Sequence, residues 1–143
     1  MRLSSLADYA VVLMSAAARA GDGARLSAAT LAEQTRVPLA TAQKLMQRLA
    51  AAGLLRSARG TGGGFTLTRP VAAISLADIV EAIEGPIGLT TCVDAERDNC
   101  ALDHHCQTKP HWGAVNQAVR GALAGVSLAQ LAAPPVAQPK VLA

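Results

Sequence analysis

Apolar residues recur every three or four positions near the start of the chain, which is the spacing of one face of an α-helix. The pattern begins after Ser5, and Asp8 lies three residues further on, as in a capping box. It stops at Gly21. A first helix is therefore expected between these limits. Its apolar stripe consists of Leu6, Ala10, Leu13, Met14 and Ala17.

Two more helices with a tight connection are expected next. The first is short, starts after Ser27 or Thr30 and ends near Gln34. The second opens at Pro38 and ends at Gly53. Its apolar stripe consists of Ala42, Leu45, Leu49 and Ala52. Two short helices joined in this way predict a helix-turn-helix.

The second helix of this pair has a polar face opposite its apolar stripe. At about 100° per residue, the positions near its N-terminus would be the ones to enter a DNA major groove. A solvent-exposed polar face, which most surface helices have, is the alternative. The residues on this face that are predicted to contact DNA are Ala40, Thr41, Gln43, Lys44 and Arg48.

The segment after Gly53 predicts a β-hairpin with a glycine-rich tip. Residues 65–68 alternate apolar with hydroxylic side chains, and residues 62–64 are three consecutive glycines. Glycines leave a thin tip, so Arg59, Gly62 and Gly63 are predicted to contact DNA, and Arg69 can also approach a phosphate backbone. A nucleotide-binding phosphate loop is disfavoured, because no Gly-Lys-Ser/Thr follows and the glycines do not open a helix.

The charges divide unevenly along the chain. The formal net charge is +3, but residues 1–70 carry nine Lys and Arg against three acidic residues, a net +6. Residues 71–143 carry four against seven, a net −3. A basic first half favours a polyanionic partner and fits double-stranded DNA.

A fourth helix and a long irregular segment follow the hairpin. The helix begins at Ser75, which forms a capping box with Asp78, and ends at Gly85. From Gly85 to Pro110 there are 26 residues without a clear period. Such a length is too great for an idle loop in a compact domain, which indicates a function or an organising ligand.

The last long helix is expected to start at Pro110 and to pair with a second copy of the chain. Trp112, Val115, Val119 and Ala122 follow one another at steps of three, four and three residues, which is a heptad seam. Packing of this seam onto its own domain is the alternative. Beyond Ala132 the chain is rich in Pro and Ala, and no fixed structure is expected there.

Three cysteines lie in the irregular segment. Seven residues separate Cys92 from Cys100, and five separate Cys100 from Cys106, so the three thiolates can reach one metal centre. An odd number of cysteines and the lack of a secretion signal favour ligation over disulfides, and a cytoplasmic location is expected. Soft thiolates accept zinc as well as an iron–sulfur cluster, and the spacing does not separate the two.

Two other classes of protein are disfavoured. A thiol enzyme would need a general base and a substrate cleft, and the sequence offers no convincing pair, so we do not expect an enzyme. The longest apolar run, residues 10–18, is too short to span a bilayer, so no membrane partner is expected.

Four stretches together resemble the IscR/NsrR family of bacterial winged-helix regulators. They are the opening Met-Arg-Leu-Ser with Asp8-Tyr9-Ala10, the tip Arg59-Gly-Thr-Gly-Gly-Gly-Phe65, the stretch Ala82-Ile-Glu-Gly-Pro-Ile87 and the three-cysteine segment. Within that family the chain most resembles regulators of the SUF iron–sulfur assembly system. The resemblance implies a homodimeric repressor whose iron–sulfur cluster, with two or four irons, sets its affinity for an operator.

The chain departs from this family at one ligand position. IscR-like members usually carry a histidine three residues after the third cysteine, where this chain has Lys109. The nitric-oxide-sensing branch takes a fourth ligand from an aspartate in the first helix, and Asp8 occupies that position here. The resemblance therefore implies Asp8 as the fourth ligand beside Cys92, Cys100 and Cys106, with His111 as the second choice.

The expected fold is mainly α with a small β-hairpin wing: a winged helix-turn-helix plus a long dimerisation helix. The expected division is a DNA-binding domain at residues 1–84, a cluster-binding loop at 85–109, a dimerisation helix and a short C-terminal helix at 110–131, and a tail at 132–143. A zinc- or thiol-based redox or nitric-oxide-responsive repressor on the same scaffold is the alternative function.

Overall fold

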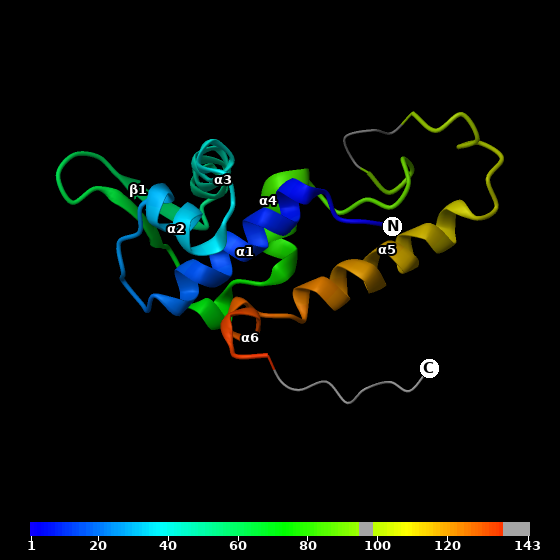
Figure 1. Ribbon diagram of the computed structural model, residues 1–143. Coiled ribbons are helices and arrows are strands. Elements are labelled where there is room, and N and C mark those ends of the chain that lie inside the picture. The colour runs from blue at the N-terminus through cyan, green and yellow to red at the C-terminus, as the bar shows by residue number, and fades with distance from the viewer. Residues whose placement is uncertain (95–98, 136–143) are drawn as a thin grey trace.

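The structure, a computed structural model, describes residues 1–94 and 99–135 (Figure 1). The chain is mainly helical with one two-stranded antiparallel hairpin, which confirms the predicted fold class. Figure 1 shows the first four helices and the hairpin gathered into one body. Helix α5 begins away from this body and runs back toward it, and α6 packs against it. The elements are α1 (Ser5–Arg19), α2 (Ala28–Thr35), α3 (Leu39–Ala51), β1 (Leu55–Ala58), β2 (Gly64–Leu67), the 3₁₀-helix η1 (Val71–Ala73), α4 (Leu76–Glu84), α5 (Lys109–Ala124) and α6 (Leu128–Ala132).

Helix α1 lies at the centre of the hydrophobic core. Helices α2, α3, α4 and α6 all pack against it. Its Leu13 and Met14 are completely buried, together with Leu45 and Leu49 of α3. Full burial of one such side chain stabilises the fold by about 1.5–3 kcal/mol. Most positions of the apolar stripes read from the sequence therefore point inward, and the polar face of α3 is left outside. Leu6 and Ala52, the outermost members of the two predicted stripes, are exposed instead.

The N-terminus of α1 is capped one residue earlier than expected. The Ser4 hydroxyl oxygen accepts a hydrogen bond from the Ala7 N–H at 3.1 Å. The predicted capping box between Ser5 and Asp8 is therefore wrong. The physical reason lies outside the helix, since the Ser4 N–H donates to the Glu84 carboxylate at 2.8 Å and this contact holds Ser4 in the cap position.

The predicted hairpin is present, and a short segment before α2 pairs with its second strand. Leu55 lies opposite Leu67 in the antiparallel register of β1 and β2. Leu26, just before α2, exchanges two backbone hydrogen bonds with Phe65 at 2.8 and 2.9 Å. The connection between α1 and α2 thus pairs with β2 at the end of the strand nearest the wing tip.

The C-terminal part of the described chain closes the same core. The capping box of Ser75 and Asp78 is present, as predicted, with hydrogen bonds of 2.8 and 3.1 Å. Leu128 of α6 is completely buried, and its N–H donates to the Ile74 carbonyl at 2.7 Å. The boundaries expected at residues 84 and 110 stay a prediction, but α6 shares its core with residues 1–84.

Helix α5 differs from the other long helices because it contributes nothing to the core. No residue of α5, all of which the structure describes, is buried, and Val115 is 43% exposed. The expected tail falls mostly on residues 136–143, which lie outside the described residues. Within the described ranges, none of the helices combines the length and apolar character needed to cross a membrane.

Removing the observed cap of α1 should destabilise the protein, whereas removing the neighbouring serine should not. We expect Ser4→Ala to lower the free energy of unfolding by about 0.5–2 kcal/mol, because the Ala7 N–H loses its acceptor. Ser5→Ala is the matched control and should stay within about 0.5 kcal/mol of the parent. Urea denaturation followed by circular dichroism at one fixed chain concentration measures both. A larger loss of unfolding free energy for Ser5→Ala than for Ser4→Ala would indicate that Ser5 provides the cap instead.

Candidate nucleic-acid interface and cysteine loop

The N-terminal half of α3 presents the residues predicted to read DNA. Ala40, Gln43 and Lys44 are exposed and Thr41 is half-buried. Within residues 1–94 and 99–135, no side chain caps the start of this helix, which follows Pro38. Uncapped backbone N–H groups at a helix N-terminus attract anions such as phosphate. This end of α3 therefore offers polar side chains and free backbone donors on one exposed surface.

Arg48 has a partner inside the protein. Its guanidinium donates a hydrogen bond to the Ile83 carbonyl in the last turn of α4, and its side chain is partly buried. Carbonyls in the last turn of a helix lack partners within that helix, so an arginine satisfies one of them here. The DNA contact expected of Arg48 stays a prediction, and this contact gives the residue a structural role between α3 and α4.

The glycines of the wing tip are required by its backbone. The wing tip is residues 59–63, between β1 and β2. Gly62 has a φ of +78°, which L side chains rarely adopt. A Cβ on Gly63 would lie 2.5 Å from the Ala58 carbonyl oxygen. These glycines shape a tight tip that carries the exposed Arg59, and contacts of Gly62 and Gly63 with DNA stay predictions.

Two other arginines near the wing have partners within the protein. The Arg25 guanidinium, from the connection between α1 and α2, donates to the Gly62 carbonyl and ties the wing tip to that connection. Sequence reasoning missed this contact, because Arg25 gave no signal except its charge. Arg69 lies 3.7 Å from the Asp78 carboxylate and also donates to the Ala73 carbonyl at 3.3 Å.

A groove runs between the C-terminal part of α3 and the hairpin. Gln47 of α3 and Arg56, Arg59 and Phe65 of the hairpin are among its lining residues. Two arginines beside an aromatic ring suit a phosphate backbone, which needs positive charge more than a specific hydrogen-bond pattern. Arg56 and Gln47 were not among the predicted DNA contacts.

The three cysteines lie on the loop between α4 and α5, and none forms a disulfide. Cys92, Cys100 and Cys106 are all partly buried, and the Cys92 Sγ lies 3.1 Å from the Thr90 Oγ1. In the part of the chain that the structure describes, no three His, Cys, Asp or Glu side chains come together as a metal-binding group. The thiols therefore share a loop without converging on one point.

The candidates for a fourth ligand are spread over two helices. Asp8 is exposed on the first turns of α1, and His111 is exposed on the first turn of α5. Lys109, at the position of the family's histidine, forms an ion pair with Asp103. That hydrogen bond is the main reason why the pKa of Asp103 lies below its usual value. The ion pair joins Lys109, at the start of α5, to the preceding loop. A protonated lysine cannot be a ligand to iron, so this residue does not replace the family's histidine as a ligand.

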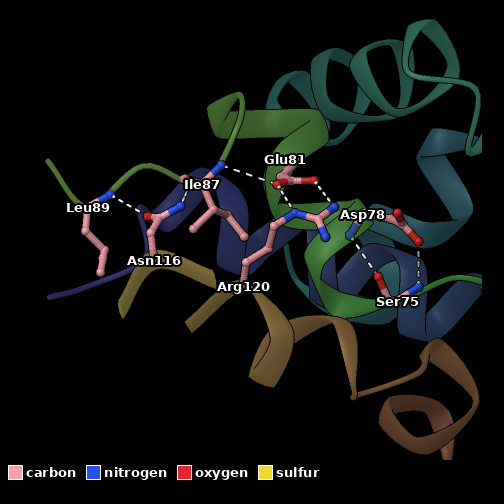
Figure 2. Close-up of polar contacts among 7 residues, drawn as sticks. All are labelled: Ser75, Asp78, Glu81, Ile87, Leu89, Asn116 and Arg120. Atoms are coloured by element: carbon pink, nitrogen blue, oxygen red, sulfur yellow. Dashed lines mark hydrogen bonds and ion pairs between the residues drawn. The ribbon is translucent and has the colours of Figure 1, made fainter. Parts of the chain in front are cut away.

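The start of this loop is held against α4 and α5 by the side chains of Glu81, Asn116 and Arg120 (Figure 2). The Asn116 side chain bonds to the backbones of Ile87 and Leu89, both at 2.9 Å. Arg120 forms a two-point ion pair with Glu81 of α4 at 2.9 and 3.0 Å. The hydrogen bond to Glu81 raises the pKa of Arg120 above its usual value. Sequence reasoning missed this cluster, although Asn116 and Arg120 are four residues apart and share a helix face.

The heptad seam of α5 is only partly covered. Trp112 and Val119 are partly buried, whereas Val115 and Ala122 are exposed. Val119, Ala122 and Leu123 line one wall of a groove of about 790 Å³, whose other walls include Leu3 and Ile87. The seam therefore packs in part on its own chain and leaves apolar side chains facing outward.

Comparisons with known proteins agree with this architecture. The model of the Rrf2 family, described as iron-dependent transcriptional regulator, matches residues 3–134. The HTH-type transcriptional regulator IscR of Photorhabdus laumondii is 30% identical over 131 residues, which cover 92% of this chain and 79% of that protein.

Solved structures of CymR show the same fold. CymR of B. subtilis, a global cysteine regulator, superposes with a TM-score of 0.73 at 25% identity and covers 92% of this chain and 96% of its own. The oxidized form of CymR from Staphylococcus aureus gives 0.69 at 27% identity, covering 95% and 99%. The proteins compared are regulators of transcription and not enzymes, as expected from the sequence.

Removing the charge at the wing tip should weaken DNA binding through loss of a phosphate contact. For Arg59→Ala we expect lower affinity and a slope of log K against log salt that is shallower by about 0.9, the value for one phosphate contact. Fluorescence anisotropy with a duplex selected by the parent protein, at several salt concentrations, measures both. Arg19→Ala, an exposed arginine at the end of α1, is the control. An unchanged slope for Arg59→Ala would remove the wing tip from the interface.

Proposed function

Because the chain belongs to the Rrf2 family of iron-dependent transcriptional regulators, we propose that it represses iron–sulfur cluster assembly genes and senses its signal through an iron–sulfur cluster. Membership in the family makes it a DNA-binding regulator of transcription. The proposal adds the cofactor, the target genes and the sign of the regulation. The observation that carries it is the presence of three free cysteines on the loop that joins α4 to α5.

The donor set fits an iron–sulfur cluster. Cys92, Cys100 and Cys106 are free thiols, none is sealed in the core, and all lie within one loop. Clusters are held mainly by cysteine thiolates, with other side chains completing the set in some proteins. When bound, a cluster supplies iron that binds these thiolates and releases them when it is lost or altered. Because the thiols do not converge in the described residues, the loop has to rearrange to gather them.

The fourth ligand is proposed to be Asp8, with His111 as the second choice. Both side chains are exposed, so either is accessible to a rearranged loop or to a partner subunit. A carboxylate is a harder ligand than a thiolate, and such a bond to iron would be comparatively labile. Lability suits a sensor, because a signal then needs to break only one weak bond.

A change in the loop is proposed to act on DNA binding through a homodimer. The loop leads directly into α5, whose Val115 and Ala122 face outward and offer a seam to a second copy. In a dimer, a shift of α5 changes the spacing of two α3 helices. A tenfold change in affinity for the operator needs about 1.4 kcal/mol, which the gain or loss of one ligand bond can supply.

A thiol-based or zinc-based repressor is the second candidate. Its support is that the three thiols do not converge and that oxidized CymR of Staphylococcus aureus has the same fold at 27% identity. Such a sensor would keep the same DNA-binding surface and would respond through thiol oxidation or zinc. It would lack a visible chromophore, whereas iron–sulfur proteins are brown.

Replacing two valines of the α5 seam with charged residues should separate the dimer. We expect Val115→Glu with Val119→Glu to sediment as a monomer and to bind DNA weakly, because a monomer offers one reading helix instead of two. Gln117→Glu adds a charge at an exposed polar position of the same helix and is the control. Sedimentation velocity measures the outcome. A dimer that persists in the double variant would place the interface elsewhere.

Anaerobic purification should yield a brown protein that contains iron and acid-labile sulfide. Any one of Cys92→Ala, Cys100→Ala and Cys106→Ala should lose both the absorbance and the sulfide, because each removes a ligand. DNA affinity should differ between the cluster-loaded and metal-free forms of the parent protein. A colourless protein containing zinc or no metal, with thiols that alter DNA binding on oxidation, would support the second candidate instead.

The fourth ligand can be identified in the same preparation. Asp8→Ala should keep the fold, since Ser4 and not Asp8 provides the cap of α1, yet lose its cluster faster in air than the parent. His111→Ala is the matched comparison and should decay like the parent. A normal lifetime for Asp8→Ala together with a short one for His111→Ala would assign the ligand to His111.

A further inference from the structure

The side-chain amide of Asn116 fixes the backbone that leads to the first cysteine. Its Oδ1 accepts the Leu89 N–H at 2.9 Å, and its Nδ2 donates to the Ile87 carbonyl at 2.9 Å (Figure 2). Only Thr90 and Thr91 separate Leu89 from Cys92. One side chain of α5 thus satisfies a donor and an acceptor of the loop, and displacement of the cysteine segment must pull on this helix.

A single carboxylate joins α4, α5 and the loop. The Glu81 oxygens accept from the Arg120 Nε and Nη2 at 2.9 and 3.0 Å, and Oε1 also accepts the Ile87 N–H at 3.3 Å. Two parallel hydrogen bonds fix the orientation of both side chains more strictly than one contact would. The raised pKa of Arg120 has the same cause, so the guanidinium stays charged in this pair. Movement of α5 or of the loop therefore acts on α4.

The C-terminal end of α4, which carries Glu81, also contacts α3. Ile83 lies two residues after Glu81, and its carbonyl accepts a hydrogen bond from the Arg48 guanidinium of α3. Helix α4 also packs directly against α3 and α1. A continuous set of contacts thus leads from the segment before Cys92, through Asn116 and Glu81, to the helix that presents Gln43 and Lys44.

We propose that Asn116, Arg120 and Glu81 are positioning residues that transmit the state of the cysteine loop to α3 through the contact between Ile83 and Arg48. This inference rests on the proposed sensing function and names the residues that couple its two sites. The loop is the element with two arrangements, since its thiols are dispersed here and must converge to share a ligand. The energetic coupling resides in these side chains and not only in the dimer seam.

The first test compares two states of each variant on one DNA probe. The probe is a duplex selected from a random pool with the parent protein, and the states are metal-free and reconstituted with iron and sulfide. If the parent changes affinity about tenfold, Asn116→Ala and Arg120→Gln should each change less than about threefold, with metal-free affinity within about threefold of the parent. Gln117→Ala, the exposed neighbour on α5, should keep the full ratio. A variant that merely weakens the fold would lower both affinities and leave their ratio unchanged.

The second test needs no cluster. The three thiols are alkylated with N-ethylmaleimide, and hydrogen exchange is measured by mass spectrometry over α3 and α4. Alkylation should alter exchange in both helices of the parent and of Gln117→Ala, and in neither helix of Asn116→Ala or Arg120→Gln. Thermal melts establish that the variants fold, and if one fails to fold the other decides.

The outcomes separate this inference from the sensing function. If reconstitution with iron and sulfide does not change the DNA affinity of the parent protein, the proposed sensing function is wrong. The hydrogen-exchange experiment alone then tests the coupling residues. Variants that respond like the parent in both tests overturn the coupling residues and leave the sensor intact. The coupling residues are also ruled out if alkylation leaves hydrogen exchange in α3 and α4 of the parent protein unchanged.

Discussion

Burial of the apolar face of α1 against α2, α3, α4 and α6 is the constraint on which the rest of the structure depends. Alanines at positions 7, 10 and 17 are buried, and side chains this small allow neighbouring helices to approach closely. Helix α3 is held there by Leu45 and Leu49, so its opposite face has to be outside. The C-terminal helix α6 returns to the same core through Leu128. The face of α3 predicted to contact DNA and the cysteine loop are therefore attached to the same core.

The basic residues of the first half of the chain serve two roles, exposed charge and internal contacts. The basic residues concentrate in residues 1–70, where Lys44 and Arg59 are exposed on α3 and the wing. Several other arginines there are engaged by carbonyls or a carboxylate of the same chain, as Arg25 and Arg48 are. The surplus of positive charge thus overstates the number of side chains available for DNA, because some of it stabilises the wing and the contact between α3 and α4.

The loop and α5 combine weak burial with specific polar contacts. No residue of α5 is buried in the single chain, a statement that covers the whole helix, so apolar packing alone does not fix its position. Hydrogen bonds from Asn116 and the ion pair of Arg120 hold it against α4 and the start of the loop. Exposed ion pairs contribute little to stability, typically below about 1 kcal/mol. Contacts of this strength are compatible with the movement of this segment that we propose for sensing.

The amino-acid sequence by itself determined the helices, the wing and the position of the cysteines. Periodic apolar residues and glycine-rich turns are local signals, and they placed α2, α3, α4 and the hairpin within a few residues. The resemblance of the wing and cysteine segments was enough to indicate the family that the match over residues 3–134 shows. Charge on the first half was sufficient to favour DNA as the partner.

Tertiary structure alone decided which polar groups meet. Two adjacent serines could each cap α1, and Glu84, eighty residues away, selected Ser4 by binding its N–H. In the sequence nothing distinguished three polar residues, Asn116, Arg120 and Glu81, from ordinary surface residues. Only the folded chain brings them together between α4, α5 and the loop. The fourth ligand stays a prediction, because Asp8 and His111 lie on different helices and spacing does not choose between them. Long-range pairing depends on the packing of apolar faces across the whole chain, and no local pattern encodes it.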